Sequence, residues 1–115
     1  MKIRLVLAIA SIAVFGLAAS AQAQDKALIE KGMKVYGDQK CSMCHAIAGK
    51  GNAKGPLDAV GSKYTGDEIR LWMTDPKAMT AKTKAARTPA MKAYPSLPKA
   101  DMDALVAYML SLKKK

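Results

Sequence analysis

The sequence has few of the side chains that build a large core or a conventional metal site. Aromatic residues make up 5% of its 115 residues, and it has two cysteines and one histidine. A closed zinc site usually takes four Cys or His ligands, so one here would need carboxylates. A disulfide between cysteines this close in sequence would restrain little of the unfolded chain. A chain this small needs additional stabilisation, and a cofactor is the expected source.

A membrane-spanning run is also lacking, and the first 23 residues instead have the layout of a secretory signal peptide. Lys2 and Arg4 give a positive start, an apolar run follows, and Ala21-Gln22-Ala23 is a small-x-small cleavage pattern. The apolar run is shorter than the ~20 residues that a bilayer span needs, and an uncleaved anchor is the alternative. We expect residues 1–23 to be removed during export to the periplasm. The mature domain at 24–115 should have no stable membrane insertion.

Acidic side chains are scarce relative to basic ones. The chain has 9 Asp and Glu against 19 Lys and Arg, and removal of two basic residues with the leader leaves a net charge of +8. A charge of this size steers association with partners of opposite sign. Export and the lack of a recognisable binding motif argue against nucleic acid. The expected partners are redox proteins with acidic docking surfaces.

No segment alternates with a strand period, whereas three segments carry helix signals. Residues 25–36 place apolar side chains at three- and four-residue steps, behind Asp25 as a cap. Thr65 and Glu68 form a capping box that opens a second helix, which should end before a proline. A third helix should begin near Pro98, because proline is tolerated in a first turn. The pattern predicts an all-α domain with about three main helices.

Two long segments lack a helical pattern. Residues 41–61 contain the cysteines, four glycines and a proline, and are expected to form a loop with short helical turns. Residues 77–95 are basic and interrupted by two prolines, and are expected to form an extended loop. A loop of this length inside a small domain is usually functional or flexible.

The pentapeptide Cys41-Ser42-Met43-Cys44-His45 is the most informative pattern. C-x-x-C-H is typical of c-type haem attachment: the two thiols add across the vinyl groups of haem, and the adjacent histidine can bind the iron. A thioredoxin-like dithiol would need a βαβ pattern, and a plain disulfide gives the histidine no role. We expect one haem c, covalently bound through Cys41 and Cys44, with His45 as the proximal axial ligand.

A methionine is the expected distal ligand, because His45 is the sole histidine. Four of the seven methionines beyond the leader lie on apolar helical stripes and are expected to pack in the core: Met33, Met73, Met102 and Met109. Met43 lies between the tethering cysteines. Of the two in the basic loop, Met91 has prolines on both sides that stiffen its backbone, so it is preferred and Met79 is the second choice.

With these features the chain resembles a small bacterial class I c-type cytochrome over essentially its whole mature length. The resemblance rests on Gly32 and Tyr36, the pentapeptide, Gly55-Pro56-Leu57, Leu71-Trp72, Asp75-Pro76, Met91 with Ala93-Tyr94-Pro95, and the closing helix from Leu105 to Leu112. One departure is Met91-Lys92-Ala93, where the family often has Met-Pro-Ala. The resemblance implies a cytochrome c-like fold, with about three main helices wrapped around one haem.

The resemblance also implies roles for residues around the haem. Gly32 and Tyr36 should pack against the last helix near Tyr108. The Pro56 carbonyl should accept a hydrogen bond from the second ring nitrogen of the proximal histidine, and this contact would fix the ring orientation. Trp72 and Tyr94 are candidates to contact the haem or its propionates, and ordinary core packing is the alternative for both.

The resulting functional prediction is a periplasmic monohaem cytochrome c that carries one electron and is not an enzyme. Low-spin iron with His45 and Met91 bound would leave no open position for oxygen or peroxide. A haem c subunit of a periplasmic dehydrogenase complex is the alternative, since both use the same domain. A gas-binding or peroxidatic haem protein would require an open distal position. The chain is expected to be a monomer or a subunit of a redox complex.

Overall fold

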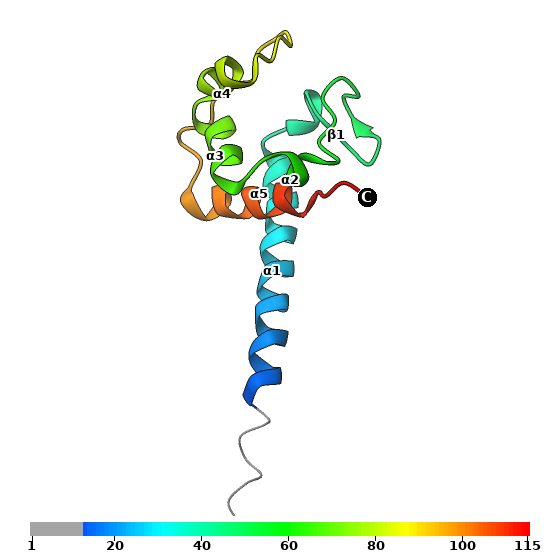
Figure 1. The fold of residues 1–115 in the computed structure, drawn as a ribbon, viewed down its shortest axis with the longest axis vertical. Helices are drawn as coiled ribbons and strands as arrows, with labels where there is room; N and C mark the ends of the chain where they lie inside the picture. Colours follow the sequence, from blue (N-terminus) through cyan, green and yellow to red (C-terminus); the bar gives the residue numbers. More distant parts are fainter. Residues whose placement is uncertain (1–12) are drawn as a thin grey trace, which may run out of the picture.

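The computed structural model describes residues 13–115, with side chains from residue 25 onward. The elements are α1 (Ala13–Asp38), the 3₁₀ helix η1 (Cys41–Met43), β1 (Ala46–Ile47), β2 (Lys50–Gly51), α2 (Val60–Lys63), α3 (Gly66–Thr74), α4 (Pro76–Thr83) and α5 (Lys99–Ser111) (Figure 1). Helices dominate, and the strands are one antiparallel pair of two residues each. The predicted helical class is confirmed. None of the described helices is both long enough and apolar enough to cross a membrane.

Helix α1 begins earlier than the sequence pattern indicated. It runs for 26 residues, so Asp25 lies inside the helix and is not its cap. The stretch before Asp25 is rich in alanine, the strongest helix former, and continues the helix upstream. The proposed cleavage point after Ala23 falls within α1, and residues 1–12 of the proposed leader lie outside the described part of the chain. The helix ends at Asp38, as predicted.

The crossing of α1 and α5 is the main packing contact of the fold (Figure 1). A Cβ on Gly32 would meet the Ala104 carbonyl oxygen and lie 2.6 Å from the Tyr108 Cβ, so only glycine allows this approach. The Tyr36 and Tyr108 rings meet edge to face, with their centroids 5.9 Å apart. The predicted packing of Gly32 and Tyr36 near Tyr108 is confirmed.

The hydrophobic core lies where α1, α3 and α5 meet. Its buried members are Val35, Ile69, Met73, Met102, Leu105, Val106 and Met109. Three of the four methionines on apolar stripes belong to it, as expected. Met33 is 51% exposed, so its place in the core was predicted wrongly. Sulfur-containing side chains thus fill much of a core that has few aromatic residues.

The capping box at the start of α3 is confirmed. The Thr65 hydroxyl accepts a hydrogen bond from the Glu68 backbone N–H at 3.2 Å, and the Glu68 carboxylate accepts one from the Thr65 backbone N–H at 3.1 Å. Glu68 also pairs with the Lys82 ammonium at 3.3 Å. This pair ties the first turn of α3 to the last turn of α4.

The predicted extended loop at 77–95 is wrong in its first part, which forms α4. Asp75 caps this helix by accepting a hydrogen bond from the Ala78 backbone N–H at 3.2 Å. Pro76 occupies the first turn, where its missing N–H costs nothing, so it begins a helix as well as ending the previous one. The chain leaves α4 through Lys84 in the left-handed region, with φ of 57°. Residues 84–98 are irregular up to the predicted start of α5.

Substitution at Gly32 should destabilise the fold selectively. We expect Gly32→Ala to lower the free energy of unfolding by about 1–3 kcal/mol, because its Cβ collides with the backbone of α5. Gly37 lies in the same helix, and a Cβ there would meet nothing within 4 Å. Gly37→Ala is therefore the matched control and should leave stability unchanged or raise it. Urea unfolding checks both, and equal effects of the two substitutions would contradict the packing argument.

Stability should depend on pH through Glu68. The Thr65 backbone N–H, and after it Lys82, hold the pKa of the Glu68 carboxyl below its ordinary value. A group with a depressed folded-state pKa stabilises the fold above the unfolded-state pKa of about 4.3, and this contribution is lost as pH falls through the folded-state value. We expect Glu68→Gln to unfold at lower urea concentration than the wild type at neutral pH, with the two midpoints converging in acid. Asp67→Asn removes a carboxylate from the same turn, and an equal loss there would refute the assignment.

Candidate functional site

The pentapeptide forms a tight turn directly after α1. The Cys41 carbonyl oxygen accepts hydrogen bonds from the backbone N–H groups of Cys44, at 3.1 Å, and His45, at 2.9 Å. Cys41 is half-buried, Cys44 is exposed, and both are free thiols. We refer to residues 41–45 as the attachment turn. It presents two unpaired thiols and an imidazole from five consecutive residues.

The His45 ring is oriented by a backbone carbonyl on the next loop. Its Nδ1 atom lies 3.1 Å from the Gly55 carbonyl oxygen. A carbonyl only accepts, so Nδ1 carries the proton and Nε2 keeps the lone pair that binds a metal. The predicted partner, the Pro56 carbonyl, is therefore wrong by one residue. The Gly55 carbonyl oxygen already faces β1, because it also accepts a hydrogen bond from the Ala46 backbone N–H at 3.0 Å.

The surroundings of the imidazole favour its neutral form. Burial lowers the pKa of His45, and the nearby Arg87 guanidinium lowers it further, while the hydrogen bond to Gly55 opposes both. Neutral imidazole is the form that coordinates a metal. The site thus supplies a nitrogen ligand without a proton to displace.

Two glycines allow the backbone to fold closely around the attachment turn. A Cβ on Gly55 would meet the Cys44 carbonyl oxygen and the Arg87 guanidinium, and would lie 3.0 Å from Nδ1 of His45. Gly51 has a φ of +108°, and a Cβ there would meet the His45 carbonyl oxygen. The segment after β2 is fixed by the Asn52 backbone N–H, which donates to the His45 carbonyl at 3.0 Å.

The two candidate methionines differ in burial and in local structure. Met79 lies on α4 and is 0% exposed, so protein packing already encloses it. Met91 lies in the irregular segment after α4, is half-buried and packs against the core cluster. Full enclosure is what a core side chain requires, whereas a half-buried thioether in a loop can meet a cofactor. The choice of Met91 stays a prediction.

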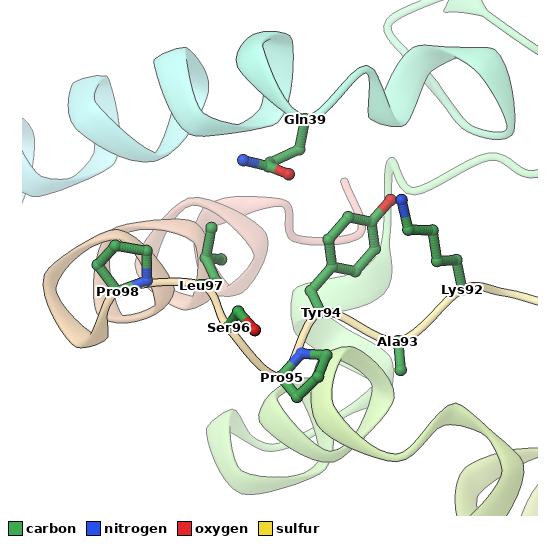
Figure 2. A pocket seen from close by; sticks show the side chains of 8 residues that line it. All are labelled: Gln39, Lys92, Ala93, Tyr94, Pro95, Ser96, Leu97 and Pro98. Carbon is green, nitrogen blue, oxygen red and sulfur yellow. The ribbon is translucent and has the colours of Figure 1, made fainter.

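A cavity of ≈ 330 Å³ separates the end of α1 from the segment that follows Met91 (Figure 2). It is lined by Gln39 and by the run from Lys92 to Pro98. Figure 2 shows the Tyr94 ring and the Lys92 side chain side by side, and the Lys92 ammonium lies 5.4 Å from the ring centroid. Burial raises the pKa of Tyr94, and the Cys41 and Cys44 thiols raise it further. The Tyr94 side chain therefore forms part of the wall of this cavity.

Trp72 supplies a test of whether a haem fits these residues. Its Nε1 atom is buried and finds no hydrogen-bond partner among the described residues. Its ring packs edge-on against Tyr64, with centroids 6.1 Å apart. A buried indole N–H normally has an acceptor, so an acceptor from outside the protein is expected. A haem propionate is such an acceptor, and with two free thiols and a neutral imidazole the donor set fits haem.

Comparison with known proteins assigns the chain to a family of electron-transfer proteins that bind haem. The family model for cytochrome c matches residues 29–113, so the chain belongs to the cytochrome c family. A protein of Alkalihalophilus pseudofirmus named cytochrome c oxidase subunit 2 is 31% identical over 109 residues, which cover 87% of this chain and 30% of the relative. The chain thus spans less than a third of that relative's length. No solved structure matches. The class I resemblance is confirmed.

Sequence reasoning missed two residues of the site. Gly55 belongs to the sequence resemblance, but its carbonyl was not predicted to accept the hydrogen bond from the His45 ring. Arg87 donates a hydrogen bond to the Cys44 carbonyl across 43 positions of sequence. No local pattern predicts such a contact, because neither a spacing nor a composition bias accompanies it.

Replacement of Gly55 should impair loading of the site. We expect Gly55→Ala to lower the fraction of exported protein that carries haem covalently, because the Cβ displaces the attachment turn and the histidine's acceptor. Intact-mass spectrometry with a pyridine haemochrome spectrum measures this fraction. Gly37→Ala is the control and should load as the wild type does. Wild-type loading of Gly55→Ala would show that the close approach is unimportant.

Proposed function

We propose that this chain is a periplasmic monohaem cytochrome c that carries one electron at a time and is not an enzyme by itself. The observation that carries the proposal is the attachment turn, where two free thiols adjoin an imidazole whose Nδ1 proton is engaged by a carbonyl. Membership of the cytochrome c family supports it. Residues 1–23 are proposed as the cleaved leader and 24–115 as the mature domain.

The chain's own residues would hold one haem c in defined ways. Cys41 and Cys44 would form the thioether bonds, and His45 would coordinate through Nε2. Met91 is proposed as the distal ligand, and Trp72 as a hydrogen-bond donor to a propionate. When bound, haem supplies a one-electron iron couple, and a thioether ligand raises its potential. With both axial positions filled, the protein offers no open site for oxygen or peroxide.

The proposed partners are redox proteins with acidic docking surfaces. The mature chain would carry a net charge of +8, and such a charge accelerates encounter with an acidic partner at low ionic strength. The segment that bears Met91 contributes exposed cations, including Lys92 and Arg87. A monomer that docks transiently is consistent with this distribution of charge.

A second candidate function is that of a haem c subunit in a redox complex. The named relative favours it, because a cytochrome c oxidase subunit 2 contains the matching region as 30% of its length. A periplasmic dehydrogenase is the other complex that uses such a subunit. Stable stoichiometric co-purification with other chains would favour a subunit, whereas recovery as a free monomer would favour the carrier.

The choice of distal ligand can be tested with two methionine variants of the holoprotein. We expect Met91→Ala to abolish the methionine-to-iron charge-transfer band of the oxidised protein and to let the reduced protein bind carbon monoxide. Met79→Ala should keep the band and instead lower the free energy of unfolding by about 2–5 kcal/mol, because it leaves a cavity in the core. The reverse pattern would assign Met79. A colourless exported product with both thiols alkylatable would refute the proposed function itself.

A further inference from the structure

The segment that carries Met91 has little packing of its own. Every residue from Ala81 to Ala90 is exposed, and Met91 is the first half-buried residue after them. The backbone leaves α4 through a left-handed residue and has no helix or strand until α5. Met91 itself packs against the core cluster, but burial does not explain how the exposed residues before it are held in place.

One hydrogen bond on each side of Met91 fixes this segment. On its C-terminal side, the Tyr94 backbone N–H donates to the Met73 carbonyl at the end of α3, at 2.7 Å. On its N-terminal side, the Arg87 guanidinium donates to the Cys44 carbonyl of the attachment turn. Among the described residues, no other hydrogen bond or ion pair joins 85–93 to the rest of the chain.

The exposed Arg87 side chain makes its contact directly on the backbone of the attachment turn. The guanidinium lies where a side chain on Gly55 would otherwise project. Its acceptor is the carbonyl of Cys44, the residue directly before His45. A charged donor on a backbone carbonyl makes a stronger hydrogen bond than a neutral one. The planar guanidinium is suited to such a fixed geometry, and a lysine is not its equivalent.

We propose that Arg87 is a positioning residue that latches the Met91 segment onto the attachment turn. Because the turn carries the proximal histidine, the latch fixes the distance between the two ligand-bearing segments directly through the protein. It also holds a positive charge beside the site, which favours the reduced iron. This inference rests on the proposed His45 and Met91 ligation, and it adds a residue that is not one of the proposed ligands.

The latch is tested with holoprotein variants whose haem content is first measured by mass. In Arg87→Gln the reduced protein should bind carbon monoxide about tenfold faster than the wild type, since the lost interaction is one charge-assisted hydrogen bond. Its charge-transfer band should weaken and its midpoint potential should fall. Arg87→Lys keeps the positive charge but not the planar guanidinium. It should therefore restore the midpoint potential more fully than the charge-transfer band. Neither the band nor the potential would change if Arg87 only solubilised the surface.

Lys84→Asn is the matched control. It removes one positive charge from the same segment, and asparagine tolerates the left-handed backbone of that position. We expect its band, potential and carbon monoxide binding to equal those of the wild type. If haem-loaded Arg87→Gln behaves as Lys84→Asn does, the proposed latch is refuted and the proposed function is unaffected. Lack of covalent haem in the wild type would refute the proposed function instead.

Discussion

The close approach of Gly55 to the attachment turn is the contact on which the site depends. A residue without a side chain lets one backbone carbonyl orient the His45 ring, and it leaves room for Arg87 to reach the Cys44 carbonyl. A Cβ at this point would collide with the Cys44 carbonyl oxygen, a backbone atom that cannot move as a flexible side chain can. The attachment turn and the distant Arg87 segment therefore meet around a single glycine.

The rest of the fold positions the attachment turn through contacts away from Gly55. Gly32 lets α5 lie against α1, and α1 ends where the attachment turn begins. The core between α1, α3 and α5 is compact but poor in aromatic side chains. Trp72 and Tyr94 remain half-buried beside it, one with an unpartnered N–H and the other at the edge of a cavity. Haem bound at this place would add the apolar area that the polypeptide lacks, so cofactor binding and folding stability are linked.

Local signals in the sequence predicted the parts of the structure that local physics determines. The capping box at Thr65, the start of α5 at Pro98 and the attachment pentapeptide each need only a few adjacent residues. The prediction failed where the same residues end one helix and begin the next, as Asp75 and Pro76 do between α3 and α4. It also failed where a contact is distant in sequence, as between Arg87 and Cys44. The histidine's acceptor was missed by one position, since the choice between neighbouring carbonyls depends on how the strand pair turns.

An electron carrier and a gas-binding protein on this fold differ in whether the distal position of the iron stays filled. A thioether is a weak ligand, so its identity alone does not keep the distal position filled. Under the proposed Met91 ligation, the segment that bears the thioether must stay in place while the iron changes charge, and that segment is exposed for ten residues before Met91. Besides the packing of Met91 against the core cluster, two hydrogen bonds to backbone carbonyls anchor this segment, one on α3 and one on the attachment turn. If Met91 is the distal ligand, as proposed, these anchors matter to a carrier as much as the methionine does, and we expect a variant that lost either anchor to acquire an open distal site with its ligand still present.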